Sequence, residues 1–165
     1  EAFLLLFLII RVDDKAQDYL AQEKLFGDMV YNKFPDSRND ITEAGNCFAL
    51  DRHTACVYHT MRAVEQAVKK LTKRETIKKA LFQHKQQKFD DKDTLGKIAQ
   101  KMSLAASNVK GKNKQEKIHC AASHLTSIAS AYRNPTMHTN IVYSGKDAKL
   151  ILDNARQFMV VICSI

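Results

Sequence analysis

The chain has 165 residues with two prolines and five glycines, a length that suits one domain with a substantial buried core. Apolar residues recur at helical spacing and strand-like alternation is rare, so the sequence predicts an all-α fold. Four cysteines without a CxxC pair exclude a secreted disulfide framework. They indicate reduced, mostly buried thiols in a cytoplasmic protein.

The net charge of +8 is unevenly distributed along the chain. Residues 69–117 contain fourteen lysines and Arg74 against five acidic residues, which is a local charge of +10. Such a basic segment is typical of a nucleic-acid-binding surface. The alternative is a solvated lysine-rich surface that only keeps the protein soluble.

Residues 1–12 are expected to form an extended apolar segment that packs on a single helical domain at residues 13–165. The unbroken apolar run at 2–10 is too short to cross a bilayer. It also lacks the basic leader and small-residue cleavage site of a signal peptide, so no membrane partner is expected. The chain begins with Glu1 and not with Met, and we expect residues upstream of it.

Two helices are expected in the first half of the domain. The first spans 13–33 and ends at Phe34-Pro35, with expected core positions Tyr19, Phe26, Met29 and Val30. Asp40 and Glu43 have capping-box spacing, which predicts a second helix from about Ile41 to Leu71 with a bend near Asp51. Its second half carries an apolar stripe at three- and four-residue steps: Val57, Met61, Val64, Val68 and Leu71.

Glu65 lies on this stripe, where a carboxylate is costly unless it is paired. One interpretation is a local bond to Arg62 one turn earlier. The other is a carboxylate that orients an Arg or His of an active site. On the same helix, His53, Cys56 and His59 fall within two turns but match no zinc-ligand spacing. We therefore predict no metal site and no cofactor.

The basic segment interrupts the helical pattern. Residues 73–92 predict one short helix around 77–84 followed by a mobile loop. The helical stripe then returns at Leu95, Ile98, Ala99, Met102 and Ala105. A basic loop around Gly111 follows at 108–114. We expect Lys110, Lys112 and Lys114 to bind RNA if this segment contacts nucleic acid.

Two strongly amphipathic helices are predicted in the last third of the chain. The first has apolar residues at Ile118, Ala121, Ala122, Leu125, Ile128, Ala129 and Tyr132. The last begins at a capping box formed by Ser144 and Asp147, and its stripe is Ala148, Ile151, Leu152, Ala155, Phe158, Met159 and Ile162.

The connection between these two helices carries the sequence RNPTMH, residues 133–138. Arg133 offers a planar fork of donors that fits a phosphate, and His138 has an unperturbed pKa of about 6.5, suited to proton transfer near neutrality. Pro135 should end or kink the helix, which can bring both side chains to one side. The alternative is a helix-capping arginine beside a surface histidine.

These residues resemble the HEPN superfamily of small α-helical domains, whose hallmark is an Arg-polar-x3-5-His motif. Arg133, Asn134 and His138 match it. The stretches at 43–68 and 140–159 resemble the long second helix and the final helix of an uncharacterised bacterial HEPN-like group. The resemblance covers residues 13–162 and implies a helical bundle that commonly forms a homodimer with two motifs across the interface.

The resemblance also implies a function. Many HEPN proteins are metal-independent ribonucleases of toxin–antitoxin, phage-defence or RNA-processing systems, and others are non-catalytic modules. We therefore expect an endoribonuclease with Arg133, Asn134 and His138 as catalytic residues, RNA as substrate, and in some systems an antitoxin protein as partner. The alternatives are a HEPN-like module that binds RNA, a nucleotide or a partner protein, and a purely structural bundle.

Overall fold

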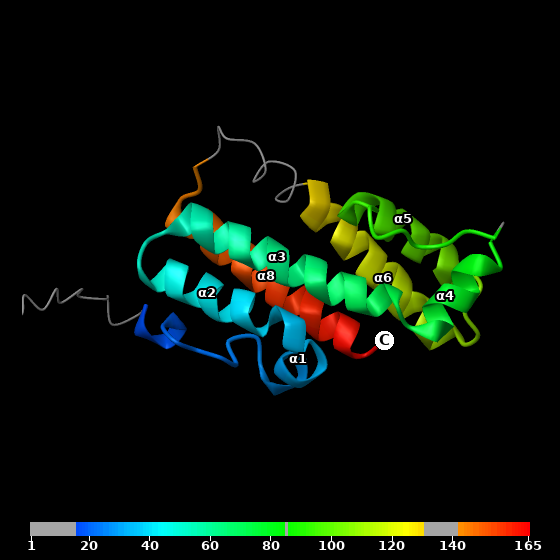
Figure 1. The fold of residues 1–165 in the computed structure, drawn as a ribbon, viewed down its shortest axis with the longest axis horizontal. Helices are drawn as coiled ribbons and strands as arrows, with labels where there is room; N and C mark the ends of the chain where they lie inside the picture. Colours follow the sequence, from blue (N-terminus) through cyan, green and yellow to red (C-terminus); the bar gives the residue numbers. More distant parts are fainter. Residues whose placement is uncertain (1–15, 85, 131–141) are drawn as a thin grey trace, which may run out of the picture.

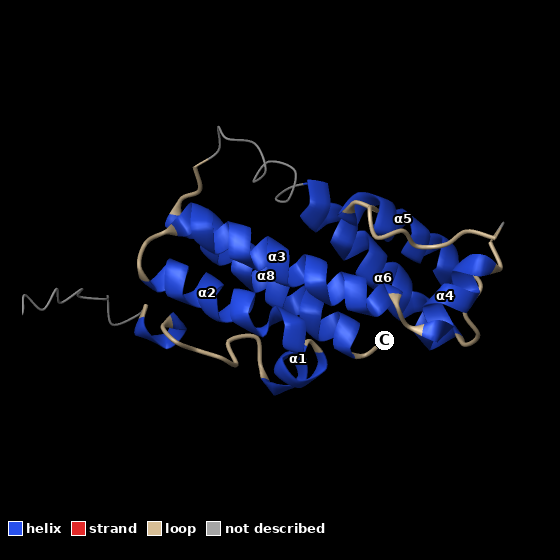
Figure 2. Ribbon diagram, in the orientation of Figure 1, coloured by secondary structure: helices blue, strands red, loops and turns tan. Residues whose placement is uncertain are grey.

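The computed structural model describes residues 16–84, 86–130 and 142–165, which form a bundle of helices without strands (Figures 1 and 2). The all-α prediction is confirmed for this part of the chain. The expected N-terminal segment 1–12 lies outside the described residues. The elements are η1 (Gln17–Tyr19), α1 (Asp28–Lys33), η2 (Pro35–Ser37), α2 (Arg38–Ala49), α3 (His53–Thr72), α4 (Glu75–Phe82), α5 (Leu95–Ala106), α6 (Lys112–Ile128) and α8 (Gly145–Cys163).

The long helix α3 runs through the middle of the bundle and packs against α2 and α8, while α6 packs against α5 and α8 (Figure 1). The predicted apolar stripes of α3, α5, α6 and α8 are buried at every position that the structure describes. Tyr132, the last member of the α6 stripe, lies outside the described residues. The stripes were readable from sequence because burial of one helix face stabilises these helices more than intrinsic propensity does.

The prediction of one bent helix over residues 41–71 is wrong. Helix α2 ends at Ala49, α3 begins at His53, and the chain reverses between them at Asp51, whose φ is 56°. Aspartate tolerates this left-handed conformation better than most residues. The reversal makes α2 and α3 an antiparallel pair, in which Ser37 before α2 donates a hydrogen bond to the carbonyl oxygen of Ala63. Both helices thereby bury their apolar faces against each other.

The predicted capping box at Asp40 and Glu43 is also wrong. The helix starts earlier, at Arg38, and its N-cap residue Ser37 makes no side-chain cap. The Asp40 carboxylate instead turns toward α3, and Glu43 accepts a hydrogen bond from Asn46. The contacts of Asp40 with α3 take the place of the local cap that the spacing predicted.

Within the described residues 16–33, η1, an irregular stretch and the short helix α1 replace the single helix that was predicted to begin at residue 13. Ala21 and Gly27 have positive φ values of 54° and 91°, which end helical geometry. Phe26 and Val30 are buried and Tyr19 packs against the core, but the predicted core residue Met29 is 61% exposed.

A close approach between η1 and α2 explains this path. A Cβ atom on Gly45 of α2 would lie 2.5 Å from the carbonyl oxygen of Tyr19, so only glycine fits there. The Tyr19 ring packs on Phe48, with ring centroids 4.7 Å apart. The N–H of Ala21 donates to Oδ1 of Asn46. These contacts hold the chain along α2, and the first α-helix of the described residues begins only at Asp28.

The short helix predicted around 77–84 is confirmed as α4, and a loop follows it. Lys101 of α5 holds this loop, because its ammonium donates to the carbonyl oxygen of Lys88 at 2.8 Å and to the Asp93 carboxylate. Helix α6 begins at Lys112, inside the stretch that the sequence predicted as a loop. The capping box of α8 is confirmed, with reciprocal bonds between Ser144 and Asp147. No described helix is both long enough and apolar enough to cross a membrane.

Candidate functional site

The predicted catalytic residues Arg133, Asn134 and His138 lie outside the described residues, as does the expected break at Pro135. Their flanking elements are described. Helix α6 ends at Ile128, before this segment, and α8 begins at Gly145, after it.

The start of α8 and the residues just before it contact the first turn of α3. The N–H of Tyr143 donates to Oγ1 of Thr54 at 3.2 Å. The backbone of Gly145 approaches the imidazole of His53 so closely that an added Cβ would lie 2.9 Å from Nε2. In the sequence, the motif lies between α6 and α8, and the start of α8 is held against α3.

The predicted RNA-binding lysines lie at the start of α6. Lys110 precedes the helix, Lys112 and Lys114 belong to its first turn, and all three are exposed. Gly111, the N-cap residue, offers no side-chain cap, and the first turn contains no acidic residue. Lysines at the positive end of a helix dipole disfavour the helix itself. The same arrangement concentrates positive potential and attracts anions.

A pocket of about 310 Å³ adjoins this helix start. Lys110 and Lys114 line it together with Lys79 of α4 and Lys117 of α6. Its remaining wall is largely apolar and includes Ile77, Val109 and Ile118. We call it the lysine pocket. It can hold a phosphate against ammonium groups beside an apolar surface, whereas Lys112 lies outside its lining.

The lysine pocket lies at the end of α6 that is farther in sequence from the predicted catalytic motif. The lysines are at the first turn of α6, and Arg133 follows the other end of that helix. Between Lys112 and Ile128 the helix rises about 24 Å at about 1.5 Å per residue. A ligand that contacts both ends of α6 must therefore be extended.

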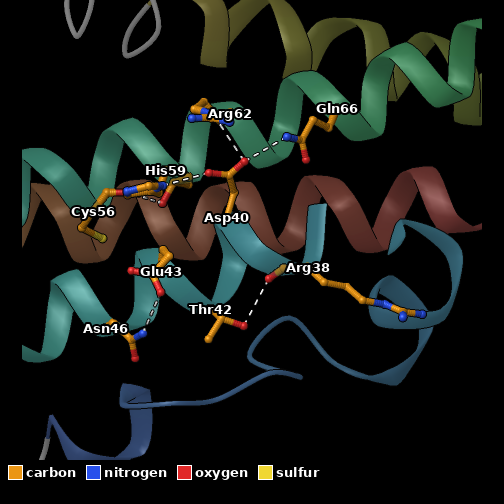
Figure 3. A network of polar contacts seen from close by, with 10 residues as sticks. Arg38, Asp40, Thr42, Glu43, Asn46, Cys56, His59, Arg62 and Gln66 are labelled. Atoms are coloured by element: carbon orange, nitrogen blue, oxygen red, sulfur yellow. Dashed lines mark hydrogen bonds and ion pairs between the residues drawn. The ribbon is translucent and has the colours of Figure 1, made fainter. Parts of the chain in front are cut away.

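A second polar cluster joins α2 to α3 (Figure 3). Oδ1 of Asp40 lies 2.8 Å from Nδ1 of His59, and Oδ2 accepts a hydrogen bond from Nε2 of Gln66 at 2.9 Å. Nε of Arg62 lies 3.4 Å from the same Oδ2. The Asp40 side chain is 4% exposed, so its charge needs these partners. Oε1 of Gln66 is buried without a hydrogen-bond partner among the described residues.

This cluster is primarily a clamp between the two helices. One face of it reaches solvent, since the side chains of His59 and Arg62 are 25% and 49% exposed. The Tyr58 ring lies beside both, with its centroid 5.6 Å from that of His59 and 5.8 Å from the Arg62 guanidinium carbon. The bond to Asp40 fixes the orientation of the imidazole.

Two residues of α3 that the sequence singled out can be placed. Glu65 is half-buried, and its predicted partner Arg62 forms an ion pair with Asp40. The choice between a local bond and an orienting role for Glu65 stays a prediction.

Burial raises the pKa of the Cys56 thiol to about 12, against a smaller opposing effect of a hydrogen bond with Thr60. Within the described ranges, no group of three or more His, Cys, Asp or Glu residues is placed to hold a metal ion.

Sequence reasoning missed Lys79 and Lys117 as members of the lysine pocket, and it missed the contact between Asp40 and His59. Lys110, Lys114 and Lys117 recur at steps of four and three, a helical signal that could have grouped them. Lys79 and the Asp40 cluster depend on contacts between different helices, for which the sequence carries no comparable signal.

Comparison with known proteins identifies no relative: no protein-family model matches the chain, and no curated protein or solved structure matches it.

Proposed function

We propose that this chain is a metal-independent endoribonuclease of HEPN type, in which Arg133, Asn134 and His138 cut RNA bound along the basic side of the bundle. The observation that carries the RNA-binding part is the lysine pocket, where Lys79, Lys110, Lys114 and Lys117 surround one cavity next to the start of α6. Four lysines that line one cavity favour a polyanion. The catalytic part rests on the motif and on its resemblance to the superfamily.

The proposed reaction uses the nucleophile that RNA itself carries. The 2′-oxygen attacks the adjacent phosphorus as a base removes its proton, and the bond from phosphorus to the 5′-oxygen breaks as an acid protonates that oxygen. His138 serves as base or acid, Arg133 stabilises the charge on the non-bridging oxygens, and Asn134 orients the histidine or the phosphate. The products are a 2′,3′-cyclic phosphate and a 5′-hydroxyl end.

Two proton transfers need two groups, and one motif supplies one histidine. We therefore propose a two-fold homodimer that brings two motifs together. Sedimentation velocity at micromolar concentration tests this assembly. If the chain is a monomer under conditions in which it cuts RNA, this result contradicts a site composed of two motifs.

A cleavage assay with the full chain tests the activity. The expected result is cleavage of single-stranded RNA that persists in EDTA, with a 2′,3′-cyclic phosphate on the product and no cleavage of DNA of the same sequence. Loss of activity in EDTA that Mg²⁺ restores overturns the metal-independent mechanism. Cleavage of the DNA overturns the role of the 2′-hydroxyl.

A non-catalytic module is the second candidate function. The apolar wall of the lysine pocket favours it, because an apolar surface beside ammonium groups suits a nucleotide as well as a polymer. Tight binding of RNA or of a free nucleotide without any cleavage is the result that selects this function. In either case the physiological setting that we propose is a toxin–antitoxin or phage-defence system, with a partner protein that controls the chain.

A further inference from the structure

A second pocket lies beside the lysine pocket and contains two aromatic side chains. Its volume is about 550 Å³, and the described residues that line it are Lys78, Lys79, Phe82, Gln83, Lys88 and Phe89. Phe82 is the last residue of α4 and is 48% exposed, whereas Phe89 comes from the following loop and packs partly against the core. We call this cavity the aromatic pocket.

Phe82 lies outside the buried core face of α4. The core positions of α4 are filled by Ile77, Ala80 and Leu81, which are all buried. The ring of Phe82 instead faces the aromatic pocket, where the ammonium of Lys88 lies 5.9 Å from its centroid. An aromatic ring beside cations is attractive to a flat, electron-rich ligand that also carries negative charge.

The charge of the aromatic pocket narrows the choice of ligand. Three of the six described lining residues are lysines, and none of these six is acidic. Glu75, 3.4 Å from Lys78, is outside the lining and offsets one of the three charges in part. A neighbouring cavity shares Lys78 and Phe89 and is lined also by Asp90, Asp91 and Asp93, of which Asp93 is bonded to Lys101. The pocket is therefore basic, and an apolar peptide or a lipid tail fits it less well than a nucleotide.

The wall of the aromatic pocket is held in place. The Lys101 ammonium donates to the carbonyl oxygen of Lys88, the residue directly before Phe89. Helix α4 packs against α5, which carries Lys101. A wall that is fixed before binding reduces the ordering cost that a ligand must overcome.

We infer that the aromatic pocket binds an unpaired base of single-stranded RNA, which stacks on Phe82 while Lys78, Lys79 and Lys88 contact the flanking phosphates. Stacking on aromatic rings within a basic groove is the usual way in which proteins hold single strands. This inference deepens the proposed function and rests on it for the choice of RNA over DNA.

The two pockets form one path for a strand. Lys79 and Gln83 line both of them, so α4 is the wall that they share. A strand with one base in the aromatic pocket can pass over α4 and place its next phosphates among Lys110, Lys114 and Lys117. Duplex RNA cannot supply the unpaired base, and it should bind this path more weakly than a single strand does.

The test measures binding of a single-stranded 2′-O-methyl oligouridylate, which the proposed reaction cannot cut. Phe82→Ala should weaken its binding by about 5- to 150-fold, the effect of losing one stacked base. Phe82→Trp should preserve binding, because tryptophan also stacks. Leu150→Ala is the matched control, since Leu150 on α8 is 54% exposed and lies outside both pockets. Melting temperatures should show that all variants are folded.

A fluorescence measurement reports stacking directly. The chain contains no tryptophan, so Phe82→Trp introduces a single tryptophan whose fluorescence can be followed. The oligouridylate should quench it, and an abasic oligonucleotide of equal length should not. Equal binding by wild type and Phe82→Ala, or quenching by the abasic strand, overturns the inference.

The same variants separate this inference from the proposed function. If wild type binds the oligouridylate and Phe82→Ala does not, but no RNA is ever cut, the pocket stands and the proposed catalysis fails. If subsaturating RNA is cut equally fast by wild type and Phe82→Ala, the proposed function stands and the pocket inference fails. If wild type binds no single strand at all, both fail.

Discussion

The carboxylate of Asp40, in the first turn of α2, lies 2.8 Å from Nδ1 of His59 in the middle of α3. The Asp40 side chain is almost fully buried and also accepts a hydrogen bond from Gln66 (Figure 3). This relationship fixes the antiparallel pairing of the two helices. It also replaces the local cap that the sequence around Asp40 suggested.

Replacing Asp40 by alanine should destabilise the fold. The substitution leaves the donors on His59 and Gln66 without their acceptor, which costs about 1–3 kcal/mol. Urea unfolding followed by circular dichroism measures the change. Asp36→Ala is the control, because Asp36 is exposed in η2 and its loss should change stability by less than about 0.5 kcal/mol. Equal stabilities of the two variants contradict the clamp.

Arg133→Ala and His138→Ala should each slow RNA cleavage. Loss of the proton-transfer group at His138 should cost about 10²–10⁴-fold in rate. Arg133 acts on the same transition state, so the double variant should lose less than the product of the two single effects. Cleavage rates measured beside thermal melts check both points. If both variants unfold, the motif is structural, and if both cut RNA normally, the site lies elsewhere.

Replacing Lys110, Lys112 and Lys114 by glutamine should weaken RNA binding and flatten its salt dependence. Each lost phosphate contact should reduce the slope of log K against log salt by about 0.7 on a single strand. Fluorescence anisotropy over a salt series measures this slope. Lys24→Gln combined with Arg156→Gln removes exposed charges elsewhere and should change the slope less per charge. If RNA binding by wild type does not depend on salt, residues 69–117 form only a solvated lysine-rich surface.

The lysine pocket should not contribute to the cleavage of RNA that is too short to reach both the pocket and the motif. We propose that the motif acts near the Ile128 end of α6. The rise of α6 from Lys112 to Ile128 is about 24 Å, which corresponds to roughly seven nucleotides of a stacked strand at about 3.4 Å each. Cleavage of shorter oligonucleotides should therefore be insensitive to Lys110→Gln and Lys114→Gln, whereas cleavage of longer ones should be slowed. A length series under subsaturating conditions tests this. An equal effect of both substitutions at all lengths argues that the lysines and the motif act at one place.

The contact between Asp93 and Lys101 should make stability sensitive to acid. Burial of Asp93 raises the pKa of its carboxyl, but hydrogen bonds from Lys101 and the Asp90 N–H outweigh this and leave the pKa below its usual value. A lowered folded-state pKa stabilises the protein above the unfolded value of about 4, and this contribution is lost as the pH falls through the folded pKa. Lys101→Met should therefore remove stability at pH 7 and change it less at low pH, in urea titrations at both pH values. A loss of equal size at both pH values contradicts the assignment.

The helical repeat in the second half of the chain was readable because each helix buries one face, and burial imposes a period of 3.6 residues. The stripes of α5 and α8 lie in the core as predicted. The capping box at Ser144 was also readable, since its two partners are three residues apart and need nothing else. The similar spacing at Asp40 and Glu43 was misleading because a histidine of another helix binds the carboxylate.

The sequence by itself determined the all-helical class, the apolar faces of the later helices and the concentration of lysines between residues 69 and 117. These features depend on local spacing and on composition. Only the tertiary structure decided that the chain reverses at Asp51, that Asp40 binds His59, and that Lys79 joins Lys110, Lys114 and Lys117 around one pocket. Such contacts join residues that are far apart in the chain, and their positions follow from how whole helices pack.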